Sequence, residues 1–252
     1  MRARWLGAIL RLSAALCVIA AGCASNQAAS PLAANSVESV QYFPFQVKGY
    51  ENTYPKRQVA VVAVVDARDF KDAGAGGHEP FEGHPAIGTV FAADGQVAQR
   101  LYGPALGDLF AGAIAQAGQE AGMSATVSPT PLKAELAARK ADYVISARVK
   151  RCWVTKHRGP DGWAGPSWRT EAVVALSVTI YKPPFEVAFW QGDSASRYDD
   201  PPVGGGAGGD ETGIYDQPGE VLSVALTRAV AGLFRQDDLR TLIAQDPIKP
   251  KF

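Results

Sequence analysis

The sequence has no excess of either charge, and it has few histidines and cysteines. Its 252 residues contain 25 Lys+Arg, 25 Asp+Glu, 3 His and 3 Cys. Proteins that bind nucleic acid usually show a basic stripe or a strongly basic domain, and this chain shows neither. It has no G-x-S-x-G motif, and no Lys-Ser/Thr follows the glycines of residues 204–209. These absences argue against nucleic-acid binding, an α/β-hydrolase and a P-loop enzyme.

Long apolar runs are also lacking, and the longest one lies near the N-terminus. Three arginines precede the apolar stretch Leu12 to Ala21, and Ala20-Ala21-Gly22 stand directly before Cys23. This order is typical of a secretory signal. It resembles a bacterial lipobox, in which the cysteine thiol takes a diacylglycerol and its freed amine takes a third acyl chain. We predict a lipoprotein signal peptide over residues 1–22 and lipidation of Cys23.

The alternatives are an ordinary signal peptide with A-x-A-type cleavage and an N-terminal membrane helix. A membrane-spanning helix needs about 20 apolar residues, and Arg11 interrupts a run that is already short. Several acyl chains anchor a protein far more firmly than one chain does. Neither Ala24 nor Ser25 is an Asp that would retain the protein at an inner membrane. We therefore expect a lipid-anchored protein on the periplasmic face of the outer membrane.

Loss of the signal peptide leaves 22 basic and 25 acidic residues, a formal charge of about −3. Cys17 leaves with the signal and Cys23 carries lipid, so Cys152 is the only other cysteine of the mature chain. No intramolecular disulfide is then available, and the fold must depend on its core. Residues 23–40 are rich in Ala, Ser and Asn and predict a flexible tether. Residues 41–252 are expected to form one periplasmic domain.

The first half of that domain combines a buried strand with a long helix. Gln58–Asp66 is a continuous Val/Ala run, which predicts a strand covered on both faces. The glycine spacing of residues 71–95 predicts a long loop with room for a short hairpin around Ile87–Phe91. Apolar residues recur at helical spacing from Val97 to Ala121, and a short second helix is expected over residues 132–140.

The second half shows three strands and then helices. Alternation of apolar and polar residues predicts strands over residues 143–155, 170–181 and 185–196, arranged as an antiparallel meander. A Gly-rich loop, residues 199–213, precedes a helix over 218–234 and a short one over 237–244. We expect one α+β domain with a mainly antiparallel sheet and two principal helices packed on one face.

Several short segments together resemble the YajG-type lipoproteins, within the wider group of auxiliary lipoproteins of ABC-type envelope transporters. The segments are Asp66-Ala67-Arg68 after the Val-rich strand, Ala141-Asp142-Tyr143-Val144-Ile145, Phe189-Trp190-Gln191-Gly192 and Glu220-Val221. The resemblance covers roughly residues 58–244 and implies an envelope-assembly or scaffolding role without catalytic residues. It does not extend to the two Gly-rich loops or to the Trp-rich hairpin loop, so functions carried there are not implied.

That hairpin loop is the predicted partner-binding site. It runs from Lys156 to Arg169 and places Trp163 and Trp168 among cations that include Arg158 and Arg169. Exposed aromatic and cationic side chains are typical of interaction surfaces. The alternative is that both tryptophans fold back over the edge of the sheet.

The rival hypothesis is a lipid-anchored hydrolase or metal-dependent enzyme that uses the loop between His78 and His84. Asp72, Glu79 and Glu82 accompany the two histidines. Their spacing matches no compact zinc motif, and Pro80 and Pro85 prevent a helical display, so a solvated loop is favoured. Cys152 and His157 lie too far apart along one strand to form a local catalytic pair.

The sequence therefore predicts a non-enzymatic, membrane-anchored adaptor or scaffold of the bacterial envelope. Its partner is expected to be an envelope protein or lipid, and no cofactor or metal is predicted. The sequence leaves the oligomeric state open.

Overall fold

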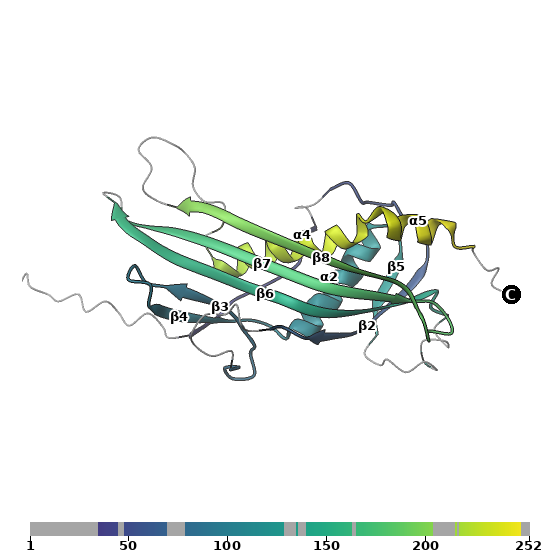
Figure 1. The fold of residues 1–252 in the computed structure, drawn as a ribbon, viewed down its shortest axis with the longest axis horizontal. Coiled ribbons are helices and arrows are strands. Elements are labelled where there is room, and N and C mark those ends of the chain that lie inside the picture. Colours follow the sequence, from purple (N-terminus) through teal and green to yellow (C-terminus); the bar gives the residue numbers. More distant parts are fainter. Residues whose placement is uncertain are drawn as a thin grey trace, which may run out of the picture. The chain divides into compact units, whose positions relative to one another are not determined.

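Three long antiparallel strands make up one side of the sheet (Figure 1). β6 (Tyr143–Gly162), β7 (Gly165–Tyr181) and β8 (Ala188–Val203) pair in chain order, and β8 is the edge of the sheet in the part of the chain that the structure describes. The predicted meander is confirmed, because β7 alternates strictly between buried residues such as Val174 and partly exposed ones such as Val173. β6 ends later and β7 begins earlier than predicted, whereas β8 begins later than predicted, at Ala188, and continues into the first residues of the expected Gly-rich loop.

The computed structural model describes residues 35–44, 48–69, 79–128, 135, 140–162, 165–203, 215 and 217–247. The predicted signal peptide, Cys23 and most of the tether lie outside these residues, as do most of the short helix expected over 132–140 and the glycines of 204–209. What is described forms one α+β domain, as the sequence predicts.

Two strands share one edge of β6, end to end. β2 (Gln58–Asp66) pairs in parallel with its first part, from Val59↔Tyr143 to Asp66↔Val149. β3 (Ala86–Phe91) pairs in parallel further along, from Gly88↔Val154 to Phe91↔His157. The parallel strand β5 (Ser124–Val127) extends the sheet beside β2. Beyond β3 lie the antiparallel β4 (Val97–Tyr102) and then the parallel β1 (Asn35–Val37). The sheet is therefore mixed, although its longest ladders are antiparallel.

The helix expected from Val97 to Ala121 is wrong over its first nine residues, because these pair with β3 as β4 or form the connection that follows. The helix, α2, spans Leu106–Glu120. Pro104 disfavours helical backbone at Gly103, and a tight β3–β4 hairpin turns at Gly95, whose φ is +80°. Leu101 fits the helical spacing of the apolar residues that follow it, but in the structure it is a buried residue of β4. Ile87–Phe91 does lie in a hairpin, as predicted, but the second strand of that hairpin is β4, in the segment expected to be helical.

The helices pack on one face of the sheet, here called the helix face, as predicted (Figure 1). α2 lies against β2 and β5, whereas α4 (Pro218–Phe234) lies across β6, β7 and β8. α5 (Asp237–Gln245) follows α4 and contributes Leu239 and Ile243 to the same core. In the part of the chain that the structure describes, none of the helices combines the length and apolar character that a membrane crossing requires.

The segment before β2 covers α4 from outside. Ser223 and Thr227 of α4 are fully buried, and their hydroxyls accept hydrogen bonds from the backbone N–H groups of Gln41 (3.0 Å) and Phe43 (2.8 Å). The hydroxyl of Tyr54 donates to the carbonyl oxygen of Phe234 at 3.0 Å. These bonds satisfy buried polar groups that would otherwise destabilise the core, and they hold the segment between β1 and β2 against α4. The last residues of the predicted tether, 35–40, therefore belong to the domain, since Asn35–Val37 pair with β4 and Val40 is buried.

Candidate binding cavity on the open face of the sheet

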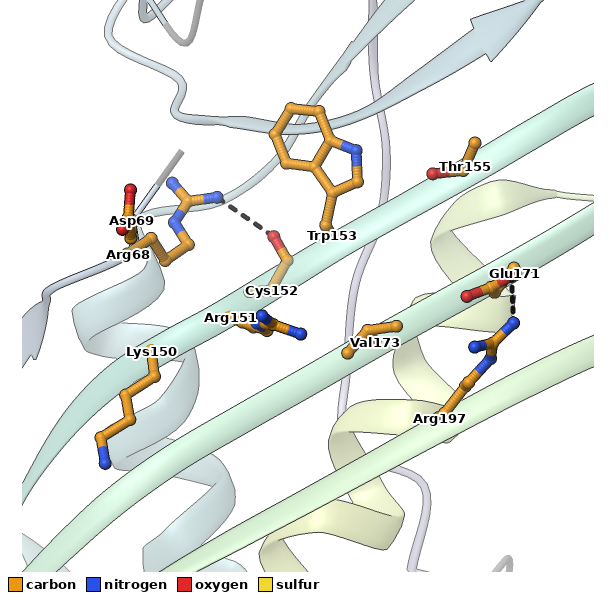
Figure 2. A pocket seen from close by; sticks show the side chains of 10 residues that line it. All are labelled: Arg68, Asp69, Lys150, Arg151, Cys152, Trp153, Thr155, Glu171, Val173 and Arg197. Atoms are coloured by element: carbon orange, nitrogen blue, oxygen red, sulfur yellow. Dashed lines mark hydrogen bonds and ion pairs between the residues drawn. The ribbon is translucent and has the colours of Figure 1, made fainter. Parts of the chain in front are cut away.

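The face of β6, β7 and β8 opposite α2, α4 and α5, here called the open face, contains a cavity of about 260 Å³. Trp153 and Thr155 of β6, Glu171 and Val173 of β7 and Arg197 of β8 line it (Figure 2). The remaining lining residues are Arg68, Asp69, Lys150, Arg151 and Cys152. The cavity therefore combines one aromatic ring with several charged side chains.

A bulge in β6 decides which residues reach this cavity. The pairing with β7 shifts between Val149 and Arg151, so one extra residue enters the strand and the side-chain alternation changes phase. Before the shift the odd-numbered residues, such as Val149, are buried in the core. After it Cys152 is buried, whereas Trp153 turns to the open face.

Arg68 forms the wall of the cavity at the junction between β2 and β3. Its Nη1 donates to the carbonyl oxygens of Ala86 (2.6 Å) and Cys152 (3.1 Å). Its Nε and Nη2 donate to the Asp66 carboxylate at 2.9 and 2.8 Å. Only 4% of the Arg68 side chain is exposed. The guanidinium therefore replaces the strand bonds that β6 lacks where β2 has ended and β3 has not begun.

The charges around the cavity are largely matched by opposite charges. Lys150 donates to Asp193 at 2.9 Å, and Arg197 donates to Glu171 at 2.7 Å (Figure 2 shows the second pair). The hydrogen bond from Lys150, helped by one from Ser177, holds the pKa of Asp193 below its usual range. Exposed ion pairs contribute little stability, so the main consequence of these pairs is that the cavity is bordered by both hydrogen-bond donors and acceptors.

The thiol of Cys152 is unsuited to nucleophilic chemistry. The residue is 1% exposed, and burial raises the pKa of its thiol to about 12. Since the thiolate is the reactive form, the cavity contains the backbone of Cys152 but no activated sulfur. Cys152 is therefore a packed core residue of β6.

The predicted partner-binding residues are divided between the two faces. Trp168 is half-buried against the core, with the Nζ of Lys156 at 5.2 Å from its ring centroid. Arg169, the next residue, is exposed on the open face and lies 3.6 Å from Asp199. Arg158 is half-buried, and Trp163 lies outside the described residues. The partner-binding role of these four residues stays a prediction.

The histidine loop is described only from Glu79 onward. His84 is half-buried, and its Nδ1 lies 3.2 Å from the carbonyl oxygen of Gly103. Glu79 and Glu82 are exposed, whereas His78 and Asp72 lie outside the described part. Within that part, no group of three His, Cys, Asp or Glu residues could hold a metal ion. An enzyme that uses this loop stays a hypothesis from the sequence.

None of the residues that line the cavity was among the predicted partner-binding residues, and Trp153 and Arg68 show why. Continuous alternation from Tyr143 places Trp153 on the buried face, and only the bulge reverses this. Arg68 entered only as part of a short segment of resemblance. The sequence did contain a signal for the bulge in β6. Lys150 and Arg151 are two consecutive charged residues, and strict alternation would bury one of them in the core.

Comparison with known proteins finds no family model that matches this chain, and no curated protein matches it. Solved structures do resemble it. Protein XCC0632 from Xanthomonas campestris is 12% identical, with a TM-score of 0.43 over 82% of this chain and 95% of that one. The PelC dodecamer subunit from Paraburkholderia phytofirmans is 12% identical, with a TM-score of 0.36 over 73% and 94%. A candidate lipoprotein from Caulobacter crescentus is 16% identical, with a TM-score of 0.29 over 62% and 92%. The YajG resemblance therefore stays a prediction.

Proposed function

We propose that this protein is a non-enzymatic lipoprotein of the bacterial envelope that acts as an adaptor or scaffold. In this proposal Cys23 carries the lipid and holds the domain at the periplasmic face of the outer membrane. The domain then binds another envelope component on the open face of its sheet. The sequence before Cys23 and the resemblance to YajG-type lipoproteins support the anchor and the envelope location.

One structural observation supports the binding role most strongly. The described helices cover one face of the β6–β8 meander, and the open face carries a cavity with a half-buried tryptophan and a fixed arginine. Aromatic rings beside organised polar groups are common where proteins bind ligands or partners. The cavity offers stacking on Trp153 and hydrogen bonds from ion-paired side chains, and its only thiol is directed into the core.

The matched ion pairs also restrict the partner. Lys150, Arg197 and Arg68 each face a carboxylate within 3 Å, so the site offers both donors and acceptors with little net charge. A polar partner with an apolar face suits such a site better than a strongly anionic one. Binding should therefore depend weakly on salt.

The anchor is tested by intact-mass spectrometry of the protein extracted from membranes, beside a Cys23→Ala variant. A triacyl mass on a chain that begins at Cys23 is expected, and it should be lost in the variant. An unlipidated wild-type protein would exclude the lipoprotein role.

The cavity is tested by pull-down from membranes in mild detergent with Trp153→Ala. Gln191→Ala, an exposed change on β8 of the same sheet, is the matched control. A component captured by the wild type and the control should be lost with Trp153→Ala. Equal capture by the wild type, Trp153→Ala and Gln191→Ala would remove the cavity from the proposal. Trp168→Ala is tested in parallel, and capture that is lost only with this variant would move the site to the hairpin.

A further inference from the structure

β8 is an edge strand in the part of the chain that the structure describes, where it pairs with β7 alone. The ladder with β7 runs without a register shift from Ile180↔Trp190 to Thr170↔Asp200. A long and regular edge presents a row of backbone N–H and C=O groups to which another strand can pair. Pro201 and Pro202, which lack N–H groups, lie beyond this regular stretch.

The contacts of Asp193 indicate which residues of β8 turn their backbone outward. Gln236, between α4 and α5, donates its side-chain amide to the carbonyl oxygen of Asp193 at 2.9 Å. The Asp193 carboxylate also accepts a bond from the side chain of Ser177, the residue opposite on β7. Side chains approach most closely at positions where the two backbones are not bonded to each other. Asp193, and with it Ala195, Arg197 and Asp199, therefore directs its backbone groups away from β7.

The side chains at these outward positions are complementary to themselves. Antiparallel pairing of two β8 strands centred on Ala195 places Asp193 opposite Arg197 of the second copy, and Arg197 opposite its Asp193. The Asp193 and Arg197 side chains are 69% and 59% exposed and can meet such partners. Alanine at the centre avoids crowding at the two-fold axis. On the other side of the strand Ser194 faces Ser196 of the second copy.

Neighbouring registers are less favourable. Moving the centre to Ser196 places Asp193 opposite Asp199 of the second copy, and like charges opposite each other are destabilising. Moving it to Arg197 places the two arginines against each other. A centre at Tyr198 also matches Arg197 with Asp199. However, it sets Pro201 opposite Ala195, and this pair lacks one backbone hydrogen bond because proline has no N–H group.

We propose that two copies of this protein associate through β8, in an antiparallel pairing centred on Ala195. The two-fold axis is perpendicular to the sheet, so the sheet continues from one copy into the other and both open faces lie on the same side. Gln236 releases the carbonyl of Asp193 when the second strand binds. This inference does not depend on the proposed function: it shares Arg197 with the cavity wall, but it rests on the free edge of β8 and requires neither ligand binding in the cavity nor the lipid.

The test uses the full chain in membranes with Ala195→Cys and a mild oxidant. Cα atoms of a hydrogen-bonded antiparallel pair are about 5.5 Å apart, within the range of a disulfide. Cys152 is buried and gives little background. Gln191→Cys is the matched control, because residue 191 would lie about 26 Å from its equivalent in the second copy. We expect at least about tenfold more covalent dimer from Ala195→Cys, and equal amounts from both would overturn the proposal.

Charge exchange tests the register in the Ala195→Cys background. Asp193→Arg alone or Arg197→Asp alone creates two like-charge contacts per dimer and should lower the dimer yield about tenfold. The double variant restores opposite charges across the axis and should recover most of the yield. The bonds of these residues to Lys150 and Glu171 within one copy stay broken in the double variant. A double variant that dimerises as poorly as the single variants would therefore contradict the proposed pairing.

Discussion

The guanidinium Nη1 of Arg68 lies 3.1 Å from the carbonyl oxygen of Cys152, at the point along β6 where β2 has ended and β3 has not yet begun. The same nitrogen reaches the carbonyl oxygen of Ala86 at the start of β3. One side chain thus connects three strands and forms a wall of the candidate cavity.

Arg68→Met should destabilise the domain by about 2–3 kcal/mol, because it removes charge-assisted bonds to two carbonyl oxygens that are poorly accessible to water. Urea unfolding followed by circular dichroism measures the change. Arg169→Met is the control, since Arg169 is exposed and makes only a loose pair with Asp199, and it should change stability by less than about 0.5 kcal/mol. Equal effects of the two variants would show that Arg68 is not the connection between the strands.

Gly88→Ala should weaken the attachment of the β3–β4 hairpin to β6. A Cβ at Gly88 would lie 2.2 Å from the carbonyl oxygen of Val154, and backbone cannot move aside as a flexible side chain can. We expect a loss of about 1–3 kcal/mol and faster hydrogen exchange at Val90. In contrast, a Cβ at Gly112 of α2 meets nothing within 4 Å, so Gly112→Ala should stabilise the domain by about 0.5–1 kcal/mol. A neutral Gly88→Ala would mean that β3 and β6 separate easily.

Cys152 should make the domain less stable in alkali. Burial raises the pKa of its thiol to about 12, whereas an unfolded cysteine has a pKa near ~8.5. The folded state therefore holds the proton more tightly, and its advantage is complete below pH ~8.5 and is lost as the pH rises through about 12. Between pH 9 and 11 the stability of the wild type should fall more steeply than that of Cys152→Ala, by up to about 1.4 kcal/mol per pH unit. Parallel pH profiles would show that the thiol is accessible to water.

Asp246 should contribute stability that is lost in acid. Burial opposes its ionisation, but hydrogen bonds from Lys182 and Tyr143 outweigh this and hold the pKa of Asp246 below its usual value. A lowered folded pKa gives stability that is present above the unfolded pKa of ~3.9 and is lost as the pH falls through the folded value. Asp246→Asn should cost about 2 kcal/mol at pH 7, with the difference from wild type shrinking below pH 4. A difference that is constant from pH 7 to pH 3 would contradict the ionic role.

Periodicity in the sequence predicted most of the elements because each repeats within its own segment. The alternation in β7 and the apolar stripe of α4 are both local patterns, and both were read correctly. The pattern over residues 97–121 was misread at its start, because Leu101 suits a strand or a helix equally well and only pairing with β3 decides between them. The four-residue strand β5 was missed, since so short a run carries no clear period.

The candidate cavity was much harder to predict than the fold. Its residues come from the end of β2 and from three strands that are distant in sequence, and the bulge after Val149 decides that Trp153 faces outward. The predicted pair Trp168 and Arg169 illustrates the same limitation. Adjacent residues of a strand point to opposite faces, so their closeness in sequence does not give one binding surface.

The sequence by itself determined that this chain is an α+β domain preceded by a predicted lipid-attachment signal, because helix and strand periods and export signals are written in consecutive residues. Only the tertiary structure decided that Arg68 closes the gap along β6, that Trp153 lines a cavity while Cys152 is buried, and that β8 is an edge strand of the sheet as far as the chain is described. These features depend on register and on pairing between distant segments, and the free energy that selects them comes from packing and hydrogen bonds that form only when the whole sheet is assembled.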